Sequence, residues 1–95
     1  MSEPDACRAD VWLWRARFFR TRSMAAKFLE EGRVRLARPG QDEHRLDKPA
    51  RPVRVGDRLV FALGGRLVAV RVEAMGDRRG PATEARTLYS TLDGA

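Results

Sequence analysis

The apolar positions near the start of the chain repeat with the period of a helix. Residues 10–19 predict a short helix that is apolar on two sides, with the Asp10 carboxylate placed to cap its first turn. Thr21 or Ser23 is expected to cap a second helix, which ends at Gly32. The apolar residues of this second helix fall on one arc at about 100° per residue, which is typical of a helix that packs on a core.

Further along, apolar and polar residues alternate, as they do in strands with one buried face. Residues 33–36 predict a half-buried strand, and residues 58–63 and 66–73 predict the two arms of a hairpin. The Gly64-Gly65 pair between those arms suits a two-residue turn, because glycine adopts positive φ angles without a steric cost. Residues 53–57 predict the end of another strand followed by a turn.

Segments rich in proline, glycine and charge separate these elements. Residues 37–52 predict an exposed loop, and residues 76–80 predict a flexible basic link. Pro81 is expected to begin a last helix, because apolar residues recur at helical spacing over residues 85–92. The predicted organisation is a flexible tail at residues 1–7, one domain at residues 8–75, and a linker with a C-terminal helix at residues 76–95.

Positive charge is concentrated in one third of the chain. The 95 residues include 19 basic and 13 acidic side chains, for a net charge of +6. Residues 8–38 hold nine bases and three acids, so they carry as much net positive charge as the whole chain. Most of the bases are arginine, whose planar fork pairs with phosphate and stacks on bases. This clustering indicates a polyanion binder, and a plain solvated surface is the alternative.

Several other classes of protein and site find no support. Cys7 is the only cysteine, and His44 has no histidine or cysteine partner at metal-binding spacing. We therefore expect His44 to be an ordinary loop residue, and we expect no metal or cofactor. No Ser–His–Asp set, paired carboxylates or glycine-rich phosphate loop is visible, which argues against an enzyme. No apolar run approaches about 20 residues and no signal-peptide pattern is visible, so a cytoplasmic protein is expected.

The order of the motifs resembles the S4-like RNA-binding domain. The residues that carry the resemblance are Arg8, Asp10, Leu13, Arg15, Thr21-Arg22-Ser23, Ala25, Gly32 and Val34, with Val55-Gly56-Asp57 as a closing turn. The dense string that runs over residues 12–23 is similar to the heat shock protein 15 family of ribosome-associated proteins. The chain departs from the family pattern at Ala9, at Val11 and in the longer loop at residues 37–47.

The resemblance implies an α+β fold of the S4-like (alpha-L) kind. Two N-terminal helices would pack on a small, mostly antiparallel sheet, and a short helix would follow near the C-terminus. The implied partner is structured ribosomal RNA of the large subunit, in stress-linked rescue or recycling of stalled subunits, and the free chain is expected to be a monomer. Two alternatives stay open: a general nucleic-acid binder that also takes DNA, and a detached targeting subunit of an RNA-modifying enzyme.

Phosphate contacts would supply most of the affinity for RNA. Arg22 is the first candidate, because it follows the cap at the start of the second helix, where free N–H groups favour an anion. For two candidates an ion pair is the alternative: Arg8 can pair with Asp10, and Lys27 can equally pair with Glu30 or Glu31 on the helix surface. The full set of candidates is Arg8, Arg15, Arg17, Arg20, Thr21, Arg22, Ser23, Lys27, Arg33 and Arg35.

The aromatic residues of the first helix could offer stacking faces for bases. Trp12, Trp14, Phe18 and Phe19 do not all fit one buried side of a helix. Core packing is expected for most of them, and Trp14 is the candidate for an exposed ring that stacks on a base.

Overall fold

The computed structural model describes residues 6–92. Seven strands and three helices follow one another, with a short 3-10 turn before the last strand. In chain order they are β1 (Ala6–Arg8), α1 (Ala9–Arg15), α2 (Arg22–Glu30), β2 (Val34–Ala37), β3 (His44–Leu46), β4 (Pro52–Arg54), β5 (Arg58–Leu63), β6 (Arg66–Val72), α3 (Ala82–Ala85), η1 (Arg86–Leu88) and β7 (Tyr89–Thr91).

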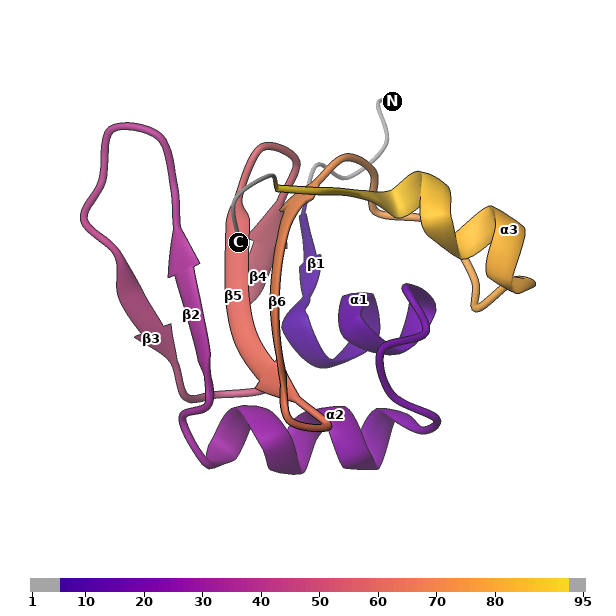
Figure 1. The fold of residues 1–95 in the computed structure, drawn as a ribbon, viewed down its shortest axis with the longest axis horizontal. Helices are drawn as coiled ribbons and strands as arrows, with labels where there is room; N and C mark the ends of the chain where they lie inside the picture. Colours follow the sequence, from indigo (N-terminus) through magenta and orange to yellow (C-terminus); the bar gives the residue numbers. More distant parts are fainter. Residues whose placement is uncertain (1–5, 93–95) are drawn as a thin grey trace.

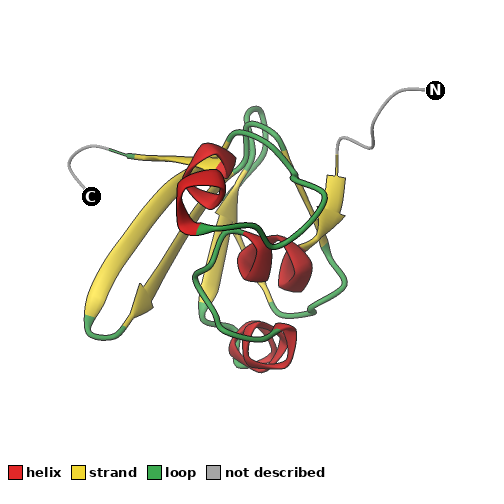
Figure 2. Cartoon of the chain, turned by 90° about the vertical axis from the view of Figure 1, so that its right-hand side faces the viewer, coloured by secondary structure: helices red, strands yellow, loops and turns green. Residues whose placement is uncertain are grey.

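The strands form two antiparallel sheets (Figure 1). The larger sheet has the strand order β3-β2-β5-β6-β7, and β1 pairs with β4 in a separate ribbon. The helices gather on one side of the larger sheet (Figure 2). This arrangement confirms the predicted α+β class, with the two N-terminal helices packed on a mostly antiparallel sheet.

The core lies between the helices and the larger sheet. Trp12 and Leu13 of α1, Leu29 of α2 and Phe61 of β5 are almost wholly buried there. Strand residues alternate between this buried face and the solvent. In β2, for example, Val34 is buried and the next residue, Arg35, is exposed. Burial of this apolar surface is the main source of stability for so short a chain.

The first helix is shorter than predicted. It ends at Arg15, and Arg17 takes a left-handed conformation with φ of 68°, so residues 16–19 form a turn rather than a helix. Arg8, not Asp10, occupies the N-cap position, and Asp10 lies inside the first turn, where its carboxylate accepts the free Val11 N–H at 2.7 Å as predicted. The turn carries Phe18 back onto Phe61, with ring centroids 5.3 Å apart, which a continued helix would not allow.

The second helix and the hairpin are confirmed. Thr21 is the N-cap of α2, and its side chain accepts a hydrogen bond from the Met24 N–H at 3.0 Å. Gly32, which follows the helix, has a φ of 71°. Gly64 and Gly65 both have positive φ between β5 and β6, as the two-residue turn requires.

Three strands lie where the sequence predicted none. β3 falls inside the expected loop at residues 37–52, and it includes His44, which we expected in a loop. β7 replaces the end of the expected C-terminal helix, which is helical only over residues 82–88. β1 includes Ala6 and Cys7 of the expected tail, whose residues 1–5 lie outside the described part. Each strand is three residues long, too short to show a period, and each pairs with a strand distant in sequence or across a long loop.

Candidate nucleic-acid interface

The ten candidate residues lie in four different parts of the structure and do not form one continuous edge of the helix pair. Arg8, Thr21, Arg22 and Ser23 lie where the two helices begin, and Arg20, Lys27 and Arg33 border a groove beside α2. Arg15 and Arg17 contact the C-terminal segment, whereas Arg35 lies on the exposed face of the larger sheet.

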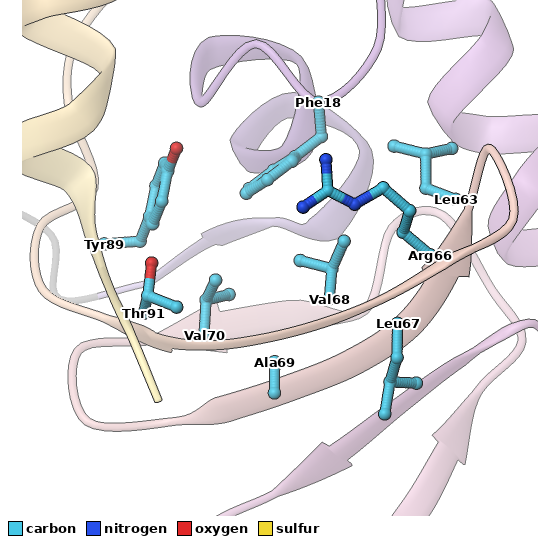
Figure 3. A pocket seen from close by; sticks show the side chains of 9 residues that line it. All are labelled: Phe18, Leu63, Arg66, Leu67, Val68, Ala69, Val70, Tyr89 and Thr91. Carbon is cyan, nitrogen blue, oxygen red and sulfur yellow. The ribbon is translucent and has the colours of Figure 1, made fainter. Parts of the chain in front are cut away.

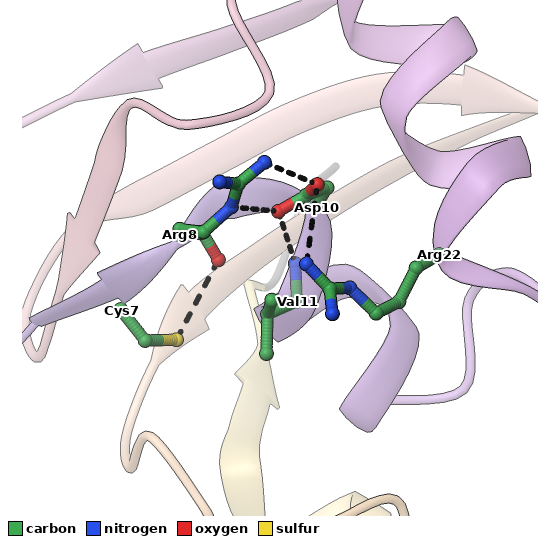
Figure 4. A network of polar contacts seen from close by, with 5 residues as sticks. All are labelled: Cys7, Arg8, Asp10, Val11 and Arg22. Atoms are coloured by element: carbon green, nitrogen blue, oxygen red, sulfur yellow. Dashed lines mark hydrogen bonds and ion pairs between the residues drawn. The ribbon is translucent and has the colours of Figure 1, made fainter.

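One buried carboxylate organises the start of both helices (Figure 4). The two oxygens of Asp10 accept hydrogen bonds from Nε and Nη2 of Arg8, each at 3.0 Å. Arg22 reaches across from α2, and its Nη2 lies 4.0 Å from the same carboxylate. The Asp10 side chain is 5% exposed, whereas those of Arg8 and Arg22 are 50% and 51% exposed. Two half-exposed guanidinium groups therefore lie beside a single negative charge, which holds Arg8 by two hydrogen bonds and attracts Arg22.

This arrangement keeps donors available for an anion. A guanidinium has five N–H donors, and Arg8 uses two of them on Asp10. The hydrogen bond to Asp10 and the negative charge of that carboxylate raise the pKa of Arg8 above its ordinary value, so Arg8 stays charged. A second negative group would meet a local excess of positive charge here, and the guanidinium of Arg8 needs little further ordering.

The hydroxyl groups beside Arg22 differ in their use. Thr21 accepts the Met24 N–H, which leaves its own O–H free to donate. Ser23 is exposed in the first turn of α2. No acidic residue stands in that first turn, so the positive end of the helix dipole is not neutralised by its own helix.

A groove of about 680 Å³ runs beside α2 and the β5–β6 turn. Arg20, Lys27 and Arg33 border it, together with the exposed Met24. Glu31 pairs with Arg33 at 3.3 Å rather than with Lys27, and within residues 6–92 Lys27 forms no ion pair. The surface ion pair that we considered for Lys27 is therefore not formed, and its ammonium group faces the groove and the solvent.

Two of the candidate arginines hold the C-terminal segment. Arg15 donates to the Gly76 carbonyl at 2.9 Å, and its Nε is buried without a hydrogen-bond partner in the described part of the chain. Arg17 donates to the Gly80 carbonyl at 2.6 Å. Arg79 donates in return to the Trp14 carbonyl at 3.1 Å. The sequence placed Arg15 and Arg17 in the RNA patch and treated Arg79 as linker, because contacts about 60 residues apart leave no local pattern.

Strand pairing places further arginines next to Arg35. Arg45 of β3 lies directly opposite it, and on neighbouring strands Arg58 lies opposite Arg71. Arg35 also lies 3.9 Å from Glu43. The sequence did not single out Arg45, Arg58 or Arg71, since the pairing that brings them together is non-local.

The aromatic side chains of the first helix and its turn are mostly core residues. Trp12 is fully buried and donates its indole N–H to the Ala74 carbonyl at 2.8 Å, and Phe19 is 6% exposed. Phe18 is half-buried and lines a second hollow of about 520 Å³ (Figure 3). There the Arg66 side chain points toward the Phe18 ring, opposite Tyr89. Trp14 is half-buried, and its stacking on a base stays a prediction.

The described residues form neither a metal-ligand cluster nor a membrane-spanning helix. Residues 6–92 contain no group of three or more metal-ligating side chains, His44 included. None of the described helices is long and apolar enough to span a bilayer.

Comparison with known proteins gives consistent matches. The S4 domain family matches residues 7–59. Heat shock protein 15 of Escherichia coli K12 is 38% identical over 82 residues, which is 86% of this chain and 57% of that protein. The Haemophilus influenzae homolog is 34% identical over 86 residues, covering 90% of this chain and 61% of that protein. The chain thus spans about three fifths of the length of these curated relatives.

A solved structure matches in fold as well. Heat Shock Protein 15 of Vibrio cholerae, described as trimeric, superimposes with a TM-score of 0.78 and 34% sequence identity. The match covers 93% of this chain and 83% of that one.

Proposed function

The chain belongs to the heat shock protein 15 family of S4-domain proteins, and on that premise we propose that it binds structured ribosomal RNA through the start of its two helices. The observation that carries the proposal is the pair of half-exposed guanidiniums at the buried Asp10, with Arg8 hydrogen-bonded to the carboxylate and Arg22 4.0 Å from it. It acts by binding rather than by catalysis. The RNA is that of the large ribosomal subunit, in stress-linked rescue or recycling of stalled subunits.

The residues contribute unequally to this proposed interface. Arg8 and Arg22 pair with phosphates, and the Thr21 and Ser23 hydroxyls add hydrogen bonds at the same helix start. Arg20, Lys27, Arg33 and Arg35 extend the basic surface on either side. Arg15 and Arg17 act mainly by holding the C-terminal segment under the interface, since their guanidiniums already donate to its carbonyls.

Titration of a folded ribosomal RNA fragment with Arg22→Gln tests the interface. Loss of one charge-assisted phosphate contact should weaken binding about tenfold and lower the slope of log affinity against log salt by about one. Arg86→Gln is the matched control, because it removes the same charge from an exposed position in η1. Equal losses in the two variants, or no loss in either, would contradict the site. Unfolding of both variants should match the wild type.

Competition and sedimentation test the identity of the partner. Excess duplex DNA should displace the bound RNA far less well than unlabelled RNA does, and equal displacement would favour a general nucleic-acid binder. In sucrose gradients of cell extract the protein should travel with the large-subunit fraction. Its absence from that fraction would refute the ribosomal part of the proposal.

We propose a monomer for the free chain, although the Vibrio cholerae relative is described as trimeric. Sedimentation velocity of the purified chain without RNA measures this directly, and a single species of about three times the 10.7 kDa chain mass would overturn it.

A further inference from the structure

The groove beside α2 combines apolar and cationic walls. On one wall Met24 and Lys27 are three residues apart and lie on the same side of α2, and Arg20 lines the groove from the turn just before the helix. Met24 is 50% exposed, so half of this apolar side chain is accessible at the groove. The opposite wall is formed by Leu63 and Gly64 at the β5–β6 turn.

A planar stacking platform stands at the end of this groove. The Arg33 guanidinium carbon lies over the Phe28 ring, 4.3 Å from its centroid, so the cationic group is held against the ring. Phe28 is 6% exposed, but the Arg33 side chain is 52% exposed, so about half of the Arg33 surface stays accessible. Arginine planes held in this way are surfaces on which unpaired bases stack.

The charge around the groove suits a nucleotide rather than a neutral ligand. Of the residues that line it, Arg20, Lys27 and Arg33 are cationic, and Glu31 is the acidic one, already paired with Arg33 at 3.3 Å. Its volume of about 680 Å³ is sufficient for a base with its sugar. The neighbouring hollow in Figure 3 has Arg66 as its single cation, and that side chain points into the hollow itself.

We propose that this groove binds one unpaired nucleotide of the RNA, an inference that rests on the proposed RNA-binding function. The base stacks on the accessible surface of Arg33 and lies against Met24, while Arg20 and Lys27 meet the flanking phosphates. The protein therefore recognises a helix interrupted by a bulged or splayed-out nucleotide in preference to a continuous duplex. Bound RNA would lie across α2, from the Arg22 side to the groove.

Two hairpin RNAs that differ only in one bulged adenosine test this inference. The wild-type chain should bind the bulged RNA about tenfold more tightly than the fully paired one, the expected effect of stacking one base. With 2-aminopurine in place of the bulged adenosine, saturation with protein should change the fluorescence as the base enters the groove.

Two variants and one control locate the effect. Arg33→Lys keeps the charge but removes the planar group, and Met24→Ala removes the apolar contact, so each should bring the ratio of the two affinities, bulged over paired, close to one. Met24→Ala, which lies outside the basic surface, should leave the affinity for the paired hairpin nearly unchanged. Leu67→Ala truncates another exposed apolar residue, 62% exposed on β6, and should keep the full preference.

The outcomes separate this inference from the function on which it rests. Equal binding of the two hairpins by the wild type would overturn the nucleotide site and leave RNA binding intact. A preference that persists in both Arg33→Lys and Met24→Ala would also overturn it. Failure of the wild type to bind either hairpin, or any folded ribosomal RNA, would instead refute the proposed function.

Discussion

At the scale of single residues, two buried carboxylates organise the arginines around them. Asp10 holds Arg8 and approaches Arg22 at the proposed interface. Asp57 is 1% exposed and accepts Nε and Nη2 of Arg38, each at 2.8 Å, together with the Arg54 N–H at 2.8 Å. The hydrogen bond to Asp57 raises the pKa of Arg38 above its ordinary value, so Arg38 stays charged. A buried carboxylate is stable only when it is satisfied in this way.

Replacing Asp57 by Asn should therefore be costly. The variant loses the charge-assisted pair with Arg38 and turns an amide toward a guanidinium donor, for a loss of about 3 kcal/mol in the free energy of unfolding. Urea denaturation measures this loss. Asp47→Asn makes the same chemical change at an exposed position and should stay within about 0.5 kcal/mol of the wild type. A loss below about 1 kcal/mol in Asp57→Asn would show that the pair contributes little.

At the scale of elements, capping decides where α2 begins. The sequence left Thr21 and Ser23 as equal candidates, because both can accept an N–H from the first turn. In the fold Thr21 has extended backbone angles, φ of −134° and ψ of 157°, whereas Ser23 is already helical. Only an extended residue directs its side chain back onto the free N–H groups of the helix.

The two hydroxyls should accordingly differ in their effect on stability. Thr21→Ala removes the hydrogen bond from the Met24 N–H and should cost about 1 kcal/mol. Thr21→Ser keeps the acceptor and should cost less, and Ser23→Ala should change the stability by less than about 0.5 kcal/mol. Thermal unfolding of the three variants compares them, and a larger loss in Ser23→Ala than in Thr21→Ala would contradict the cap assignment.

At the scale of the whole molecule, the C-terminal segment is an integral part of the fold. The carbonyls of Gly76 and Gly80 accept the side chains of Arg15 and Arg17. Its Arg79 donates to the Trp14 carbonyl in α1 and to the Phe19 carbonyl in the turn after it. Leu88 is 5% exposed and belongs to the same core cluster as Trp12. The segment thereby supports the helix whose start carries the proposed interface.

Truncating Leu88 should destabilise the entire domain. Leu88→Ala leaves a cavity in the core and should lower the free energy of unfolding by about 2–4 kcal/mol. Leu67→Ala makes the same truncation at a site that is 62% exposed, so it should cost much less. Chemical denaturation followed by both tryptophan fluorescence and far-UV circular dichroism should give one transition. Two separate transitions would mean that the C-terminal segment unfolds independently.

The sequence by itself determined the features whose signals are local. The amphipathic period of α2, the alternation in β5 and β6, and the Gly64-Gly65 turn each arise from residues a few positions apart. The string of motifs from Arg8 to Val34 also identified the S4-like fold before any contact was known. Charge clustering pointed to the third of the chain, residues 8–38, that carries the proposed interface.

Only the tertiary structure decided the features that depend on distant partners. β1, β3 and β7 exist because each finds a strand to pair with, and α1 stops at Arg15 because Phe18 packs on β5. The same packing turned Arg15 and Arg17 toward the C-terminal segment and left Arg8 and Arg22 on Asp10. The sequence specifies the charge of each side chain. The direction in which the side chain points depends on burial and hydrogen bonding, which only the folded chain supplies.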